Sequence, residues 1–254
     1  IYHDRWETIS AATKFDRMQR FGDVLPRIRR RVRRDLNRKK LDRRRVLAAV
    51  TRLLDKARLR VGSEGSVDAK GATTLDGDHV EIEGFQVALE FPSKSGQRRE
   101  LQFRDSKVAK VVRGCEELDG QHLFTYLEGD EENQITSSDV NRYLNEVADE
   151  KVTAKDFRTW WGSVVALSEL TGMSEEDRQK EREAAGRQAI QSAAESLGNT
   201  AAVCRKSYVH PGMIAAARSG ELVNLLQKIK EEKIDELAVD EVKFKQLLPL
   251  LEFS

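Results

Sequence analysis

The stretch GNTAAVCRKSYVHP, residues 198–211, contains side chains whose types and spacing suit nucleophilic chemistry. Tyr208 follows a basic pair, Arg205 and Lys206, and Asn199 lies nine residues before it. A tyrosine hydroxyl can form a covalent intermediate, and a nearby amide can donate a hydrogen bond to the developing charge. A tyrosine before a chain turn is also a common packing residue. Read alone, the stretch favours packing.

Metal-free cleavage of a DNA phosphodiester by a tyrosine would need further groups. The transition state gathers negative charge on the non-bridging oxygens, which fork-shaped guanidinium groups bind well. The departing alkoxide needs a general acid. The candidates are Arg60 in ARLRVG, Lys94 in PSKSGQ and Arg158 in TAKDFRTWW. Together with Asn199 and Tyr208, they would supply two arginines, an acid, a third donor and a nucleophile.

Each candidate also has an ordinary structural interpretation. An arginine at a helix end usually interacts with the helix dipole, and a lysine at a hairpin tip is usually solvated. An arginine beside tryptophans usually stacks or forms an ion pair, and an asparagine after glycine usually forms a turn. Only the joint occurrence of the five residues favours a catalytic interpretation.

The composition limits the class of protein. The 254 residues are 39% hydrophobic and 34% charged with only 4 Pro, which is typical of a soluble, mostly helical protein. No apolar run is long enough for a membrane span. Cys115 and Cys204 are far apart, which argues against a zinc site or a disulfide framework and favours a reducing, cytoplasmic setting. The acidic stretch 128–132 lacks the central glycine of a calcium loop, and the 4 His share no spacing, so we expect no metal site.

Charge is distributed unevenly along the chain. Residues 1–60 contain 20 Lys and Arg against 7 Asp and Glu, a net charge of +13, whereas the other 194 residues carry 24 against 36, a net charge of −12. The centre of the basic region is RIRRRVRRDLNRKKLDRRR, residues 27–45. Such a run is often a solvated helix face, but arginine suits phosphate binding, so the run also fits a nucleic-acid groove.

The predicted elements place the candidate residues. Helical periodicity covers residues 14–35 and 41–59, and Arg60 ends the second of these helices. Alternation over 72–103 predicts three or four short antiparallel strands, with Lys94 at a hairpin tip. From residue 104 onward the pattern is helical again. It predicts an N-cap within 136–140, a helix after Thr153 that carries Arg158, and helices over 174–196, 212–230 and 232–249. We therefore expect an α+β fold that is predominantly helical.

The ordered motifs RVG, SKSG, KDFRTWW and GNTAAVCRKSYVHP resemble the catalytic domain of bacterial and poxvirus type IB DNA topoisomerases. KFDRMQRFGDVLPRIRRRVRRDL looks like the first helix of that domain, and the resemblance runs through nearly the whole chain. The KDFRT box and the final box are its specific parts. The resemblance implies one catalytic domain over 1–254, with a basic helical part (1–60), a β-hairpin part (72–103) and a helical part (104–254). It also implies that an N-terminal DNA-clamping domain is largely absent.

The resemblance implies a role for each candidate residue. Tyr208 would attack the phosphorus and form a 3′-phosphotyrosyl link, releasing a 5′-hydroxyl strand. Arg60 and Arg158 would contact the scissile phosphate, and Lys94 would protonate the 5′ oxygen. Asn199 would donate to a non-bridging oxygen. Supercoiled duplex DNA would be relaxed by swivelling and religation without ATP, metal or cofactor. The protein would act as a monomer, away from membranes, in the cytoplasm with the nucleoid.

The sequence departs from the family pattern at two places near these residues. Many members have His where this chain has Asn199, and an amide cannot carry the imidazolium charge. The loop after Arg60 reads GSEGSVDAKG, which is short and lacks the usual Tyr. We therefore expect weaker transition-state stabilisation and an altered preference for DNA sites.

Two other functions fit parts of the sequence. A tyrosine recombinase or integrase shares the nucleophile, the two arginines and a lysine hairpin, but its second arginine usually lies in an HxxR box, and Lys155 occupies the His position here. A non-catalytic DNA-binding module would need only the basic region.

Overall fold

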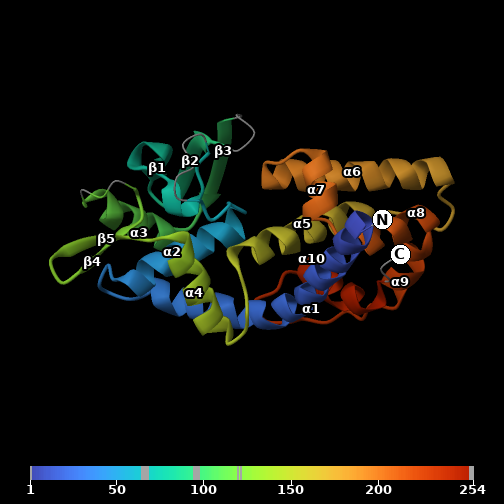
Figure 1. The fold of residues 1–254 in the computed structure, drawn as a ribbon, viewed down its shortest axis with the longest axis horizontal. Coiled ribbons are helices and arrows are strands. Elements are labelled where there is room, and N and C mark those ends of the chain that lie inside the picture. The colour runs from blue at the N-terminus through green and yellow to red at the C-terminus, as the bar shows by residue number, and fades with distance from the viewer. Residues whose placement is uncertain (1, 64–68, 94–97, 119, 121, 252–254) are drawn as a thin grey trace. The chain divides into compact units, whose positions relative to one another are not determined.

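The chain folds into two compact units, shown together in Figure 1. The computed structural model describes residues 2–63, 69–93, 98–118, 120 and 122–251, with side chains from residue 17 onward. Unit 1 comprises residues 1–26 and 159–254, and unit 2 comprises residues 27–158. The chain passes from one unit to the other within α1 (Tyr2–Leu36) and within α5 (Ala154–Leu170). The predominantly helical α+β class is confirmed.

In the part of unit 2 that the structure describes, three whole helices and the adjoining ends of α1 and α5 combine with two small antiparallel sheets. The first sheet has the order β1-β2-β3, and its register sets Val87 opposite Phe103 and Leu89 opposite Leu101. The strands predicted within 72–103 are thus present, although Ala72–Thr74 and Gly77–His79 form 3-10 turns. The remaining elements are α2 (Arg43–Lys56), β1 (Val80–Glu83), β2 (Gln86–Pro92), β3 (Arg98–Arg104), α3 (Ser106–Glu116), β4 (Thr125–Glu128), β5 (Glu131–Gln134) and α4 (Ser137–Ala148).

The β4–β5 hairpin corrects the prediction that the chain is helical throughout after residue 104. Gly129, with φ 65°, allows the tight turn between the two strands. The hairpin is followed at once by α4, whose N-cap lies inside the predicted cap segment. Thr136 accepts from the Asp139 backbone N–H at 3.1 Å, and the Asp139 carboxylate accepts from the Thr136 backbone N–H at 3.1 Å. This reciprocal capping box explains why α4 begins where it does.

Six arginines between residues 27 and 52 form ion pairs with carboxylates of unit 2. Arg29 forms a buried bidentate pair with Asp55, with both contacts at 2.8 Å. Further pairs are Arg31–Asp35, Arg38–Asp42, Arg43–Asp139, Arg44–Glu146 and Arg52–Asp105. Much of the basic region therefore holds the helices of unit 2 together, and only part of its charge faces solvent.

Unit 1 is built from helices, and its C-terminal part differs from the prediction. The helix expected over 212–230 is divided in two, and the helix expected over 232–249 begins only at Val239 and ends at Leu247. Gly220, with φ 87°, ends one helix and begins the next, because a left-handed residue cannot continue a helix. The elements are α6 (Gln179–Leu197), α7 (Ala201–Ser207), α8 (Pro211–Ser219), α9 (Glu221–Gln227), α10 (Val239–Leu247) and a 3-10 turn at Leu248–Leu250.

Trp160 of α5 lies at the centre of the hydrophobic core of unit 1. Its ring is fully buried and meets Phe21 and Phe244 edge to face, with centroid distances of 5.8 and 5.1 Å. Its indole N–H donates to Glu241 Oε1 at 2.8 Å, so the buried polar group is satisfied. Gly22 lies against the ring, and a Cβ at that position would come within 2.8 Å of it. The indole thus fixes α1, α5 and α10 together. Within the described part of the chain, no helix has the length and apolarity required to cross a membrane.

We predict that Gly22→Ala destabilises the protein by about 1–3 kcal/mol, because the added methyl group must displace the tightly packed Trp160 ring. Urea unfolding followed by circular dichroism measures the change. Gly186→Ala in α6 is the matched control, since a Cβ there would meet its nearest neighbour at 4.0 Å. Equal stability of the two variants would contradict the packing argument.

Candidate active site

Arg60 lies in an extended segment of unit 2, which corrects the prediction that it ends a helix. Helix α2 stops at Lys56, and Arg60 follows three residues after the cap residue Ala57. The carbonyl of Arg60 accepts from the Ala72 backbone N–H at 2.8 Å, and the next carbonyl, that of Val61, accepts from the Thr73 N–H at 2.7 Å. The backbone around Arg60 is therefore held by pairing with a segment that follows it in sequence.

Two glycines allow this pairing. Gly62 has φ 104°, which other residues rarely adopt, and a Cβ there would lie 2.7 Å from Thr73 Oγ1. A Cβ on Gly71 would lie 2.4 Å from the backbone nitrogen of Gly62 and 2.8 Å from the Arg60 carbonyl oxygen. The glycine of the RVG motif is therefore required by the structure, because the segments that contain Gly62 and Gly71 approach too closely for side chains at these positions.

Arg158 is anchored at the C-terminal end of α2. Its side chain is 2% exposed, and its Nη1 donates to the carbonyl of Arg58 at 2.5 Å. Arg58 has φ 55°, the left-handed conformation that turns the chain sharply after the helix. Arg99 of β3 donates from Nη2 to the preceding carbonyl, that of Ala57, at 3.3 Å. Two guanidinium groups therefore bind consecutive carbonyl oxygens at this helix end, where the dipole favours cations.

These groups and Arg60 form a cluster of like charges, which we call the arginine cluster: Arg58, Arg60, Arg99 and Arg158. Burial, and then the positive charges of the other three residues, lower the pKa of Arg99 to about 10. A fall in the pKa of an arginine means that its charged form is disfavoured in the free protein. A bound anion would reverse that effect, so the cluster is suited to a phosphate group.

Lys94, the predicted general acid, lies outside the described residues. It belongs to the connection between β2 and β3, the strand that carries Arg99. The residue before it, Ser93, is buried, and the Pro92 carbonyl accepts from the Lys70 backbone N–H at 2.9 Å. The end of β2 is thereby joined to the segment that pairs with Arg60.

Asn199 and Tyr208 lie at opposite ends of α7 in unit 1. Gly198 adopts φ 59°, and the Asn199 N–H donates to the carbonyl of Ala194 at 2.9 Å, which ends α6. Thr200 then caps α7. Tyr208 is the C-cap residue of α7 and is 9% exposed. Pro211 begins α8, as predicted, because proline suits the first helical position.

The backbone of Tyr208 rests on α5. The Ser163 hydroxyl donates to the Tyr208 carbonyl at 3.1 Å, and Gly162 lies directly beneath the same residue. The packing interpretation of Tyr208 is therefore correct for its backbone, and it does not exclude chemistry at the hydroxyl.

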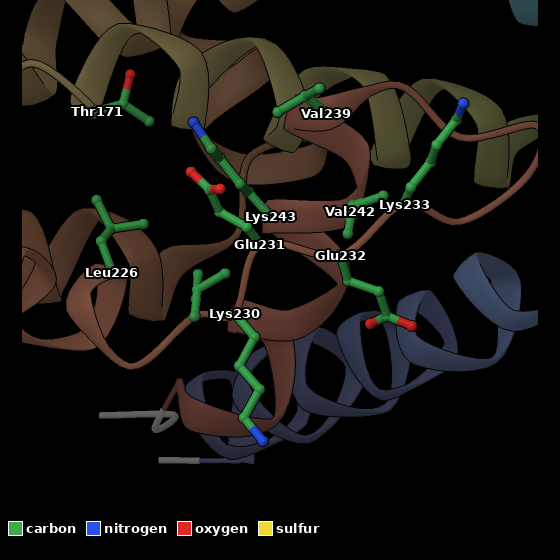
Figure 2. A pocket seen from close by; sticks show the side chains of 10 residues that line it. Thr171, Leu226, Lys230, Glu231, Glu232, Lys233, Val239, Val242 and Lys243 are labelled. Atoms are coloured by element: carbon green, nitrogen blue, oxygen red, sulfur yellow. The ribbon is translucent and has the colours of Figure 1, made fainter.

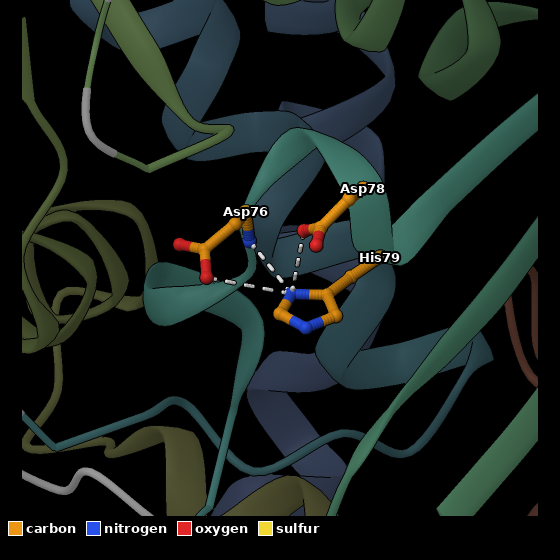
Figure 3. A group of neighbouring side chains, drawn as sticks. All are labelled: Asp76, Asp78 and His79. Atoms are coloured by element: carbon orange, nitrogen blue, oxygen red, sulfur yellow. Dashed lines mark hydrogen bonds and ion pairs between the residues drawn. The ribbon is translucent and has the colours of Figure 1, made fainter.

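Asp76, Asp78 and His79 form a possible cation site in unit 2, drawn in Figure 3. His79 Nδ1 accepts from the Asp76 backbone N–H at 3.0 Å, so its lone pair is already in use. Asp76 binds Lys70 at 2.6 Å and His122 at 2.7 Å. Burial alone would raise the pKa of Asp76, but these two partners outweigh it and the pKa lies below its usual value. The donor set thus serves an internal ion-pair network.

The structure contains a cavity of about 680 Å³ in unit 1 (Figure 2). Its walls come from the end of α5, from α9, from the segment that follows α9 and from α10. They combine apolar residues such as Leu226 and Val242 with charged residues such as Lys230 and Lys243. Of the predicted site residues that the structure describes, Arg60, Arg158, Asn199 and Tyr208, none lines it.

Sequence reasoning identified only part of this arrangement. Unit 2 brings Arg158 and Arg60 into one cluster, and unit 1 carries Asn199 and Tyr208. Sequence reasoning did not identify roles for Arg58 and Arg99, nor for Ser163 and Gly162. The signal available for Gly162 was an isolated glycine within a helical pattern, which often marks a close contact.

Comparison with known proteins agrees with these observations. The family model described as "Eukaryotic DNA topoisomerase I, catalytic core" matches residues 4–237, a range that includes all five predicted site residues. The protein "DNA topoisomerase 1B" of Acanthamoeba polyphaga mimivirus is 28% identical over 207 residues, which are 77% of this chain and 62% of that protein. The chain therefore spans less than two thirds of the length of this curated relative. With a family match over most of its length, the chain belongs to the DNA topoisomerase I catalytic-core family, of the type IB class.

Proposed function

We propose that this protein relaxes supercoiled duplex DNA by breaking and resealing one strand, without ATP and without a metal. The observation that carries the proposal is the arginine cluster at the C-terminal end of α2, in a chain that belongs to this family. Such a cluster of partly buried like charges is typical of a site built for an anion. The scissile phosphate supplies that anion.

The cleavage step uses the five predicted residues. The Tyr208 Oη loses its proton to solvent water and attacks the phosphorus, a bond forms between them, and the bond to the 5′ oxygen breaks. Arg60 and Arg158 donate to the non-bridging oxygens, whose charge grows in the transition state. Asn199 adds a neutral donor. Lys94 gives its proton to the departing 5′ oxygen, which is otherwise a poor leaving group.

Resealing is the reverse reaction. The 5′-hydroxyl attacks the phosphotyrosine, the link to Tyr208 breaks, and the strand is restored after it has swivelled. The phosphotyrosyl bond conserves the energy of the phosphodiester, so no nucleotide triphosphate is consumed. One chain supplies all five groups, which is consistent with a monomer acting on DNA of the nucleoid.

The central test measures relaxation and the covalent intermediate together. We expect the purified chain to relax supercoiled plasmid in EDTA without ATP and to form a covalent adduct on a nicked suicide substrate. Tyr208→Phe abolishes the adduct, because the nucleophile is gone, while DNA affinity stays within about twofold, as expected for loss of one hydroxyl outside the phosphate contacts. Peptide mapping of the adduct identifies the modified residue.

Other outcomes of this test point to other functions. DNA binding without any adduct supports a non-catalytic binding module and contradicts the proposal. An adduct that leads to strand exchange between two duplexes supports a recombinase. An equal loss of DNA binding in Tyr208→Phe would show that Tyr208 is structural.

A further prediction concerns Asn199. We expect Asn199→His to raise the single-turnover cleavage rate several-fold at pH 6, because an imidazolium donates a charge-assisted hydrogen bond that an amide cannot. The gain should fade above the pKa of an ordinary histidine, about 6.5. Asn199→Ala is the control and should cleave more slowly than the wild type at every pH. A pH-independent effect of Asn199→His would contradict an electrostatic role at this position.

Another prediction uses the distribution of charge in unit 2. Arg34 and Lys40 are exposed at and after the end of α1, whereas Arg43 binds Asp139 at 2.6 Å. We expect Arg34→Gln and Lys40→Gln each to lower the slope of log affinity against log salt by about one, because each removes a phosphate contact. Arg43→Gln should leave the slope nearly unchanged. Fluorescence anisotropy with a labelled duplex at several salt concentrations measures it, and three equal slopes would refute this surface as the DNA contact.

A further inference from the structure

Gly162 of α5 lies in contact with the backbone of Tyr208. A Cβ at Gly162 would lie 2.8 Å from the Tyr208 carbonyl oxygen and 2.9 Å from the Tyr208 Cβ. Real side chains do not tolerate such distances, and the obstacle is backbone together with the first side-chain atom, which cannot swing aside. Only glycine therefore permits this approach. Because glycine is disfavoured in helix interiors, its presence here indicates that the close contact has a use.

Ser163, the next residue, binds the chain at the nucleophile and just after it. Its fully buried hydroxyl donates to the Tyr208 carbonyl and accepts from the His210 backbone N–H, each at 3.1 Å. A serine within a helix commonly bonds to a carbonyl of its own helix. Here the hydroxyl instead bridges the turn between α7 and α8.

These contacts fix the atoms from which the tyrosine side chain projects. The Tyr208 N–H donates to Cys204 at 2.9 Å, its carbonyl is held by Ser163, and its Cβ abuts Gly162. With the backbone and Cβ set, only two side-chain torsions remain to place the hydroxyl. In-line attack tolerates little error in that placement, since a shift of about 1 Å can slow a reaction about 100-fold.

We propose that Gly162 and Ser163 are positioning residues that set Tyr208 for in-line attack on the scissile phosphate. The inference rests on the proposed function and deepens it. Cleavage forms a phosphotyrosine at Tyr208, and religation begins when the 5′-hydroxyl attacks that same phosphotyrosine. Misplacement of Tyr208 should therefore slow both directions by similar factors and leave the cleavage equilibrium nearly unchanged.

The test uses Gly162→Ala and Ser163→Ala in the full chain. Cleavage of a suicide substrate at saturating protein should slow about 100-fold in Gly162→Ala and about tenfold in Ser163→Ala, while DNA affinity stays at the wild-type value. The matched controls are Gly186→Ala in α6 and Ser168→Ala, which removes an exposed hydroxyl from α5. Both should cleave at the wild-type rate. Thermal melting of each variant reports whether it is folded.

A substrate with sulfur at the 5′ bridging position separates positioning from acid catalysis. Its leaving thiolate departs without a proton, so it restores the rate of variants that lack the general acid, such as Lys94→Ala. Variants with a misplaced nucleophile should remain slow on it. Rescue of Ser163→Ala by sulfur would overturn the positioning role.

The outcomes distinguish this inference from the proposed function. If the wild-type protein forms no adduct, the proposed function fails and the positioning role falls with it. If the wild type forms the adduct and both variants cleave at the wild-type rate, only the positioning role is overturned. If Gly162→Ala proves unfolded, the rates of Ser163→Ala on the oxygen and sulfur substrates decide the matter.

Discussion

The rest of the candidate site depends on the hydrogen bonds that arginine side chains donate to the carbonyl oxygens at the C-terminal end of α2. Arg158 and Arg99 come from a helix and a strand, yet both donate to this end of α2. A carbonyl orients a guanidinium group without neutralising it, whereas a carboxylate does both. The bidentate pair of Arg29 with Asp55 in the same unit shows the second arrangement. The carbonyl contacts therefore orient two guanidinium groups of the arginine cluster, and burial together with the positive charges of the other three arginines lowers the pKa of Arg99.

This difference also explains why a count of charges is a poor guide to function. The net charge of +13 over residues 1–60 suggests a continuous DNA-binding groove. In the structure, many of these arginines bind acids that are distant in sequence, such as Asp139 and Glu146. The carboxylate contacts of these arginines and the backbone-carbonyl contacts of Arg99 and Arg158 both depend on the tertiary fold.

Periodicity and local motifs predicted the parts of the fold that local physics controls. The strands within 72–103 alternate visibly, the α4 cap at Thr136 is a local pattern, and Arg158 was correctly placed in the first turns of a helix. The helix expected over 212–230 was predicted too long, because a single left-handed glycine, Gly220, divides a sequence that is otherwise helical in pattern.

The candidate site was predictable where a motif marks it and unpredictable where tertiary contacts build it. Tyr208, Arg158 and Arg60 stand in recognisable motifs, and their roles remain proposals. Arg99 looks like one more exposed residue of an alternating strand. Its importance follows only from the pairing of β3 with β2 and the contact with Ala57. No local pattern carries that information, since it depends on how a strand and a helix end meet in space.

The placement of Tyr208 depends ultimately on hydrophobic packing. Gly162 and Ser163 can hold the nucleophile only if α5 itself is fixed in unit 1, and Trp160, two residues earlier, fixes it. The Trp160 ring is buried between Phe21 and Phe244 and is hydrogen-bonded to Glu241. Close-packed interiors resist small displacements. This aromatic core therefore holds Gly162 and Ser163, which contact Tyr208, more rigidly than two hydrogen bonds alone would. A residue with no proposed phosphate contact thereby contributes to the geometry of attack. The large side chain at Trp160 and the missing one at Gly162 are therefore as much a part of the site as the arginines are.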